Sequence, residues 1–231
     1  MPRADTLELL IEVEENLNVM AASKYIKPVK IKSILEHLRS SLEYVANDTY
    51  DIYNPRTNSS RPKIYFPYGK KEMVDKFFET KIGLNDFKNS EIYHIYNSIQ
   101  GYSTGEKWLD MMCKLTNDAK HRQRISLKEE TSSRITISAN GFNLLTASDQ
   151  STVVFNNITV DGIKYSDFHL EKGVLSDSGN GAPLNFSLTE DKKIKFHGEE
   201  YEVIPFLKKC HAGIHTFVNS AYDTLQKNDK K

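Results

Sequence analysis

The sequence has no excess of either charge and almost no cysteine. Lysine and arginine together number 31, as do aspartate and glutamate, so the formal net charge is zero. Up to Ile125 the chain holds 19 basic and 17 acidic residues, and the remainder holds 12 and 14. Neither part has the strong basic excess of a dedicated nucleic-acid-binding domain, so binding of nucleic acid would need a local patch. Cys113 and Cys210 lack the spacing of a disulfide scaffold or a zinc site, which favours reduced thiols packed inside helices.

Long apolar runs and glycine-rich phosphate loops are also missing. No run approaches the roughly 18 residues of a membrane span. The first residues, MPRADTLELLIEVEEN, lack a basic region followed by an apolar stretch, so we expect no signal peptide, no membrane partner and a cytoplasmic location. His211 and His215 have a spacing that can bind a metal, but no third ligand is evident, and packing is the preferred interpretation. We therefore expect neither a metal nor a cofactor.

A helical period dominates the first half of the chain. Apolar residues recur near helical spacing in five segments: residues 4–23, 27–54, 70–83, 86–101 and 104–122. Asn54 precedes a proline and is expected to end the second helix. Thr104 is expected to cap the fifth helix at its N-terminus.

The period changes to strand-like alternation after Arg122. Asn140-Gly141 and Asp161-Gly162 are strong signals for hairpin turns. The segment LNFSLTEDKKIKF (184–196) suggests two strands joined by a charged turn, and six or seven short strands are expected before Tyr201. A last helix begins near Pro205, and its apolar stripe should dock on the first helices.

The predicted fold class is therefore α+β. Residues 1–122 are expected to form a helical bundle, and residues 123–203 an antiparallel β subdomain. Residues 204–231 are expected to form a C-terminal helix that packs back on the bundle. The β subdomain is thus inserted before the last long helix.

One polar face stands out on the helix at 104–122. At 100° per residue, Trp108, Met112, Leu115 and Ala119 form the apolar stripe. The same geometry puts another set on the opposite side: Asp110, Lys114, Asn117 and His121.

Two interpretations of this polar face stay open. It is either a solvated helix face, with basic residues favoured at the negative end of the helix dipole, or a polar constellation that faces a cleft or a dimer partner. In the second case His121 could act as a general acid or base, because histidine is the side-chain type suited to proton transfer near neutral pH. Phosphate could then be held by Lys120, Arg122 or Arg124.

The second helix carries another polar set. It includes Glu36, His37 and Tyr44, together with Arg39 and Glu43. Arg39 and Glu43 are spaced i,i+4, and such pairs are usually surface salt bridges worth a few tenths of a kcal/mol. The default interpretation of this pair is therefore structural and exposed.

Three segments together resemble a family of bacterial proteins within the HEPN-like superfamily. They are LEHLRSSLEYVANDTYD, IYFPYGKK and WLDMMCKLTNDAKHRQ, where the family has an HLRSALD-like motif, an FP segment and an N-x-x-KHR-like motif. The resemblance covers roughly residues 28–125. The matching residues are His37, Leu38, Arg39, Ser40, Glu43, Phe66, Pro67, Asn117, Lys120, His121 and Arg122.

The resemblance implies a helical bundle that is often dimeric. In catalytic members an arginine, four to six residues and a histidine lie at a dimer cleft and cut RNA without a metal. Here no arginine precedes a histidine at that spacing. Lys114, six residues before His121, is the nearest substitute, and Arg39 could supply the cation instead.

We therefore expect a homodimeric protein that acts on or binds RNA or a nucleotide, with metal-independent endoribonuclease activity of a defence or toxin type as its enzymatic form. His121 would be the acid or base, Asn117 would orient it, and Arg39 would hold phosphate. Further substrate-binding candidates are Lys120, Arg122, Arg124, His37, Glu43 and Lys114. The alternative is a non-catalytic dimeric module whose β subdomain offers sheet edges or loops to a protein or ligand.

Overall fold

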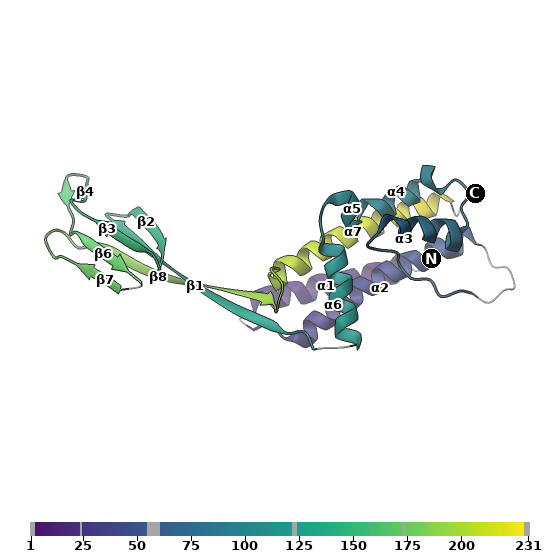
Figure 1. Ribbon diagram of the computed structural model, residues 1–231, viewed down its shortest axis with the longest axis horizontal. Coiled ribbons are helices and arrows are strands. Elements are labelled where there is room, and N and C mark those ends of the chain that lie inside the picture. The colour runs from purple at the N-terminus through teal and green to yellow at the C-terminus, as the bar shows by residue number, and fades with distance from the viewer. Residues whose placement is uncertain (1–2, 24, 55–60, 122–123, 173, 229–231) are drawn as a thin grey trace. The chain divides into compact units, whose positions relative to one another are not determined.

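The chain has an α+β fold, as predicted, in a computed structural model that describes residues 3–23, 25–54, 61–121, 124–172 and 174–228 (Figure 1). It divides into two compact units. One is Met1–Leu127 together with Phe196–Lys231, and the other is Lys128–Lys195, a narrower range than the expected 123–203. None of the described helices combines the length and the apolar character that a membrane span requires.

The first unit is helical. Its helices are α1 (Arg3–Ala22), α2 (Pro28–Tyr53), α3 (Lys71–Lys76) with the π-helical turn η1 (Phe77–Ile82), the 3₁₀ turn η2 (Phe87–Asn89), α4 (Glu91–Ser98), α5 (Gly101–Thr104), α6 (Trp108–His121) and α7 (Val203–Asn228). Pro28 starts α2, where its missing N–H costs nothing. Asn54 follows the last helical residue of α2, and its N–H donates to the Tyr50 carbonyl at 2.8 Å, so the predicted end of this helix is confirmed.

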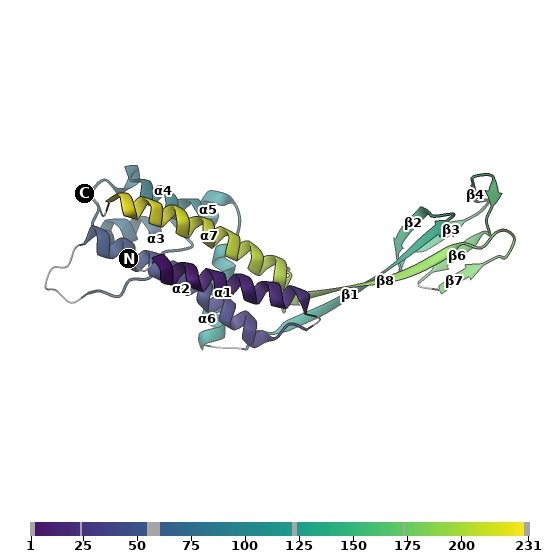
Figure 2. The ribbon, with the colours of Figure 1, turned by 180° about the vertical axis from the view of Figure 1, so that it is seen from behind.

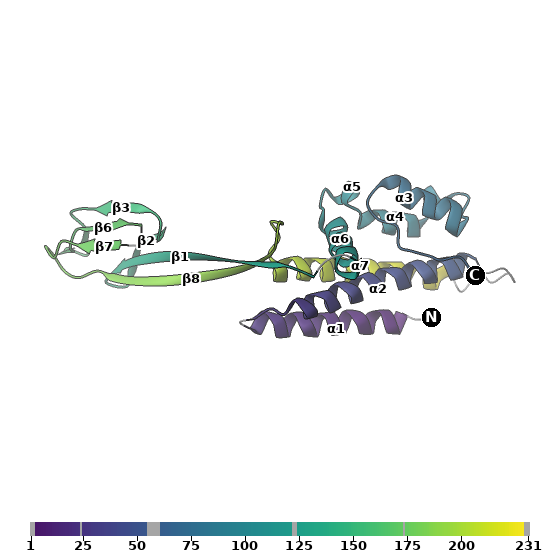
Figure 3. The same ribbon diagram turned by 60° about the horizontal axis from the view of Figure 1, so that its bottom comes forward.

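Three long helices, α1, α2 and α7, lie side by side (Figure 2). Helix α1 covers one side of the α2–α7 pair, and the shorter helices α3 to α6 cover the other side (Figure 3). Fully buried aliphatic side chains, such as Leu38 and Leu42 of α2 and Ile214 of α7, form the contacts between these helices. Each such side chain contributes about 1.5–3 kcal/mol when it leaves water, so the long amphipathic helices hold the unit together.

Residues 61–70, which lead into α3, form a segment without helix or strand that we call the extended segment. Its side chains alternate, with Ile64 and Phe66 buried and Tyr65 exposed. The Phe66 ring lies 5.3 Å from both the Tyr96 and Phe217 rings, measured between centroids. This aromatic packing fixes the chain just before Tyr68.

A buried side chain secures the other side of the same segment. Gln100 is fully buried, donates its Nε2 to the Pro67 carbonyl at 3.1 Å, and accepts the Gly69 N–H at 3.3 Å. Because a buried amide without partners would be costly, this double contact defines the path of the chain through Pro67, Tyr68 and Gly69.

The start predicted for the helix at 104–122 was wrong. Thr104 ends the single turn of α5 instead of capping the next helix, and α6 begins only at Trp108. Gly105 takes a left-handed conformation with φ 74°, which stops α5 and redirects the chain. The free cysteines Cys113 and Cys210 are both buried, in agreement with the packing role predicted for them.

The second unit is built from antiparallel strands. They are β1 (Leu127–Ala139), β2 (Phe142–Ser148), β3 (Thr152–Phe155), β4 (Thr159–Val160), β5 (Ile163–Lys164), β6 (Phe168–Glu171), β7 (Val174–Asp177) and β8 (Asn185–Phe196). The sheets have the orders β2-β1-β8, β3-β6-β7 and β4-β5. Both predicted hairpins are confirmed, since Asn140-Gly141 joins β1 to β2 and Asp161-Gly162 joins β4 to β5, with positive φ at all four residues.

The expected charged turn between two strands at 184–196 was wrong, because β8 runs through it. The charged residues pair with β1 instead of turning: Asp191 with Arg134, and Lys192 with Glu129 at 3.0 Å. The strand-like alternation before Asn140 forms one continuous strand, β1, of 13 residues.

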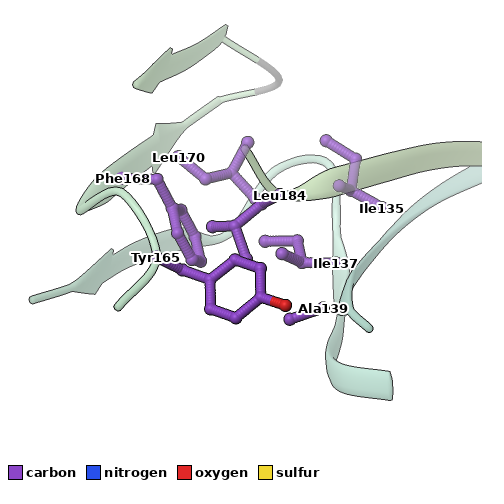
Figure 4. Close-up of a cluster of buried hydrophobic side chains, with 7 residues drawn as sticks. All are labelled: Ile135, Ile137, Ala139, Tyr165, Phe168, Leu170 and Leu184. Carbon is purple, nitrogen blue, oxygen red and sulfur yellow. The ribbon is translucent and has the colours of Figure 1, made fainter. Parts of the chain in front are cut away.

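The strand unit has its own small core (Figure 4). Side chains of β1 and β6 face one another there, with Tyr165 and Leu184 completing the cluster. Its buried members are Ile135, Ile137, Ala139, Tyr165, Phe168, Leu170 and Leu184.

Candidate functional site

The polar face of α6 lines an open hollow. The hollow has a volume of about 620 Å³, and we call it the Tyr68 hollow. Its lining residues are Tyr68, Asp110, Lys114, Asn117, Asp118 and His121. The four residues that the helical wheel put on one polar side therefore lie around one concave surface, while Tyr68 and Asp118 were not anticipated.

Tyr68 connects two of the predicted site residues. Its hydroxyl accepts a hydrogen bond from Asn117 Nδ2 at 3.2 Å. The Arg39 guanidinium lies over its ring, 4.8 Å from the ring centroid. Such a cation–π contact is worth about 0.5–2 kcal/mol depending on burial, so Arg39 helps to fix the ring that forms one wall of the hollow.

Arg39 and Glu43 are not the exposed pair that their spacing suggested. Arg39 Nη2 lies 2.6 Å from Glu43 Oε1, and the two side chains are only 13% and 21% exposed. Arg39 Nη1 also donates to Cys113 Sγ at 2.9 Å, and Glu43 Oε2 accepts the Phe66 N–H at 2.7 Å. The pair therefore connects α2 to α6 and to the extended segment, and neither residue lines the Tyr68 hollow.

Burial changes the pKa values of two groups that contact Arg39. It raises the pKa of Glu43 above its usual value, although Arg39 acts in the opposite direction. Burial also raises the pKa of Cys113 to about 11. Cys113 is therefore a neutral thiol at neutral pH, and its sulfur serves as a weak acceptor for Arg39.

A second hollow lies at the end of α6, with a volume of about 510 Å³. We call it the Lys120 hollow. Its lining residues are Pro28, Val29, Lys32, Ala119, Lys120, His121, Arg124 and Ile125. The first turn of α2 contributes the positive end of a 26-residue helix to this surface.

The charges of the Lys120 hollow are all of one sign. Lys120 and Arg124 form no ion pair with any residue that the structure describes, and Lys32 has only a loose contact with Glu36 at 3.9 Å. The hollow is therefore the local basic patch that the neutral chain needs to attract an anion.

His121 lines both hollows. It is exposed and is the last residue of α6. Lys114 lines only the Tyr68 hollow, and its ammonium is paired with Glu199 Oε1 at 2.8 Å. Lys114 is thus partly neutralised, and the unpaired cations next to His121 are those of the Lys120 hollow.

One further predicted site residue, His37, does not join this group. His37 lines neither hollow; its Nδ1 is buried without a hydrogen-bond partner among the described residues and lies 3.7 Å from Glu12 Oε2 of α1. Arg122 lies outside the described residues. In the part of the chain that the structure describes, no group of three or more His, Cys, Asp or Glu side chains could hold a metal ion.

Comparison of the chain with protein-family models, with curated proteins and with solved structures finds no match. The chemistry of the two hollows is therefore the basis for assigning a function.

Proposed function

We propose that this is a HEPN-like cytoplasmic protein that binds RNA or a nucleotide and cuts phosphodiester bonds without a metal, with His121 as the reacting side chain. The observation that carries the proposal is that His121 lines both the cationic Lys120 hollow and the polar Tyr68 hollow. A phosphate held in the first hollow and a ribose and base in the second would put the scissile bond beside the imidazole.

The proposed reaction uses the RNA's own hydroxyl. His121 takes the proton of the 2′-hydroxyl, whose oxygen attacks phosphorus and forms a 2′,3′-cyclic phosphate while the 5′-oxygen leaves and takes up a proton. Lys120 and Arg124 would stabilise the negative charge that grows on the phosphoryl oxygens. A second copy of the chain, in the expected homodimer, would bring a second His121 as the acid for the leaving oxygen.

Asn117 and Arg39 have different roles in this proposal. Both contact Tyr68, Asn117 at the hydroxyl and Arg39 over the ring. Arg39 is committed to Glu43 and Cys113, so we propose that it positions Tyr68 and does not hold phosphate. The phosphate contacts fall instead to Lys120 and Arg124.

The test is cleavage of single-stranded RNA by the pure protein in the presence of a chelator. His121→Ala is expected to lower the rate by roughly 10²–10⁴-fold, the usual effect of removing a general base. His94→Ala is the matched control, because His94 is an exposed histidine on α4 and lines neither hollow. An inactive wild-type protein, or equal rates for the two variants, would contradict the assignment.

A second candidate function is a non-catalytic interaction module. It is favoured by exposed apolar side chains on the β3-β6-β7 sheet, where Val154 is 57% and Val174 is 67% exposed. They lie on the two outer strands, paired with His169 and Glu171 of the central strand β6. If this face binds a second copy, Val174→Lys converts a dimeric mass in solution to a monomeric one, and an unchanged mass would count against it.

A further inference from the structure

Strands β1 and β8 form a two-stranded ribbon over part of their length (Figure 3). In the sheet order β2-β1-β8, strand β8 is an edge strand, and β1 pairs with β2 only from Arg134 onwards. The structure describes every residue of both strands, and no residue of β1 before Ile135 is buried. A ribbon of two strands without a covered face is only marginally stable in water, so this part of the chain would gain from a further strand.

Strand β8 offers a long and regular edge for such pairing. It has 12 residues, Asn185–Phe196, and none of them is glycine or proline. Prolines, bulges and charged side chains are the usual devices that stop an edge strand from pairing with another chain. Strand β8 does carry charges, so their order along the strand decides whether a second chain is repelled.

Hydrogen bonds show which residues of β8 direct their backbone groups to the open edge. On the β1 side, the Asp191 carbonyl accepts Ser132 Oγ at 3.5 Å. Just beyond the two strands, the His197 N–H donates to the Ser126 carbonyl at 3.0 Å. The Phe196 N–H donates instead to a carbonyl in the turn that follows β8, at 3.2 Å. Because backbone groups alternate in direction along an antiparallel strand, the odd-numbered residues bond towards β1 and the even-numbered residues bond outwards.

The outward-bonding residues form a pattern that is complementary to itself. They share one face of the strand, and they are Leu188, Glu190, Lys192 and Ile194. In an antiparallel pair of two β8 strands centred on Asp191, Glu190 lies opposite Lys192 of the second copy. In the same pair, Leu188 lies opposite Ile194 of the second copy. A shift of two residues in either direction would oppose Lys192 to Lys192 or Glu190 to Glu190, so the charges favour one register.

Asp191 meets its own counterpart at the centre of this register. Its carboxylate is already paired with Arg134 of β1, so each of the two central charges has a cation from its own chain. Lys192 contacts Glu129 of β1 at 3.0 Å, and the second copy would add a carboxylate on its other side. The pairs within one chain are therefore compatible with the pairs between two chains.

We infer that the edge of β8 is the contact surface for a second copy of this chain, with the two β8 strands paired antiparallel about Asp191. The exposure of Leu188 supports this contact, because its side chain is 62% exposed. It lies on the same face as Phe186, which packs against the small core of the strand unit. In the dimer, Ile194 of the second copy would cover Leu188 and extend this apolar face.

Charge reversal tests the register. Glu190→Lys opposes two lysines at two places in the dimer and should raise the dissociation constant of the dimer roughly tenfold or more. Lys192→Glu should do the same with opposed glutamates. A mixture of the two variants restores both opposite-charge pairs, so it should form a one-to-one dimer at a concentration where each variant alone has a monomeric mass by light scattering. A monomeric wild type, or a mixture that stays monomeric while the wild type is dimeric, would overturn the inference.

Two variants of the other sheet are the matched controls. Glu171→Lys makes the same charge change at an exposed residue of β6, and Val174→Lys adds a charge on β7. Both should keep the dimeric mass. A dimer that dissociates with Val174→Lys but not with Glu190→Lys would assign the contact to the β3-β6-β7 sheet and refute the pairing of β8.

A cysteine at the centre of the register gives a second measurement. Asp191 would occupy a non-hydrogen-bonded pair with its counterpart, where the two Cα atoms are about 4.5 Å apart, a distance that a disulfide spans. Oxidised glutathione should therefore convert Asp191→Cys to a covalent dimer on a non-reducing gel. Thr189→Cys is the control, because the two introduced thiols would stand about 13 Å apart along the strands. Equal crosslinking of the two variants, or none at position 191, would contradict the register; the native Cys113 and Cys210 are buried.

The contact does not rest on RNA cleavage, although it would supply the homodimer that the proposed reaction uses. A β8-paired dimer that cuts no RNA would leave this inference standing and refute the proposed function. Cleavage that depends on His121 in a protein that stays monomeric would do the reverse.

Discussion

Replacing Arg39 with methionine tests whether this residue holds the hollow together or acts on substrate. Arg39→Met keeps most of the side-chain volume but removes the contacts to Glu43 at 2.6 Å and to Cys113 at 2.9 Å, and the cation over Tyr68. It also leaves a Glu43 carboxylate that is only 21% exposed without its cation. Breaking a buried pair on one side costs about 3–5 kcal/mol. Because both side chains keep some contact with water, we expect about 3 kcal/mol.

The free energy of unfolding can be measured by urea titration with far-ultraviolet circular dichroism. For a chain of 231 residues, about 3 kcal/mol corresponds to a fall in melting temperature of roughly 6–12 °C. Adding Glu43→Gln to Arg39→Met should recover part of the loss, because the second change removes the stranded charge while its carbonyl can still accept the Phe66 N–H. The two changes therefore couple, as expected for residues in contact.

The pH dependence gives an independent check of the same reasoning. Burial raises the folded-state pKa of Glu43 above its unfolded value near 4.5. The folded state therefore binds the proton at a higher pH than the unfolded state, and lowering the pH through the folded-state pKa stabilises the fold. Without Arg39 this effect should grow, so the deficit of Arg39→Met should shrink as the pH falls from 7 towards 4.5. A loss below about 1 kcal/mol, combined with a large fall in RNA cleavage, would refute the structural role and return Arg39 to the catalytic set.

Two further predictions follow from the helical unit. Replacing both Lys120 and Arg124 with alanine should lower the magnitude of the slope of log K against log salt for RNA binding by about 1.4, since each phosphate contact to a single strand contributes about 0.7. Fluorescence anisotropy titrations at several salt concentrations measure this slope. The control is Lys76→Ala with Lys81→Ala, which removes the same charge outside both hollows. Gly213→Ala should destabilise the protein by about 1–3 kcal/mol, because the new Cβ would lie 2.6 Å from Trp108 Cζ2. This loss would outweigh the roughly 1 kcal/mol by which alanine normally favours a helix over glycine. A higher melting temperature for this variant would contradict the packing of α6 on α7.

The polar face of α6 could be predicted because its cause is local. Helical periodicity fixes which side chains share a face, and this was enough to group Asp110, Lys114, Asn117 and His121. Tyr68 was missed because its position depends on Gln100, which lies about 30 residues later and holds Pro67 and Gly69 on either side of it. No spacing in the sequence reports such a contact.

The burial of Arg39 and Glu43 could not be predicted from their spacing. An i,i+4 pair has the same sequence pattern whether it is exposed or buried, and only the packing of α6 and of the extended segment over α2 decides which. The prediction of a turn within 184–196 failed for a related reason. The charged run in β8 suggests a turn when viewed alone, whereas Glu129 and Arg134 of the neighbouring strand β1 provide its ion-pair partners. In both cases the deciding partner lies far away in the sequence.

The exposure of His121 constrains any catalytic role that it has. At the open end of α6 the imidazole and the cations of the Lys120 hollow face water, where the interaction of two unit charges about 4 Å apart is worth only about 1 kcal/mol. The same groups become several times more effective when a surface covers them and excludes water. In a single chain, water therefore weakens the electrostatic effect of His121 and of the cations of the Lys120 hollow. A partner that covered this surface would exclude the water. This is the physical reason to expect that cleavage, if it depends on His121, requires the homodimer, and that the monomer binds RNA through Lys120 and Arg124 without cutting it.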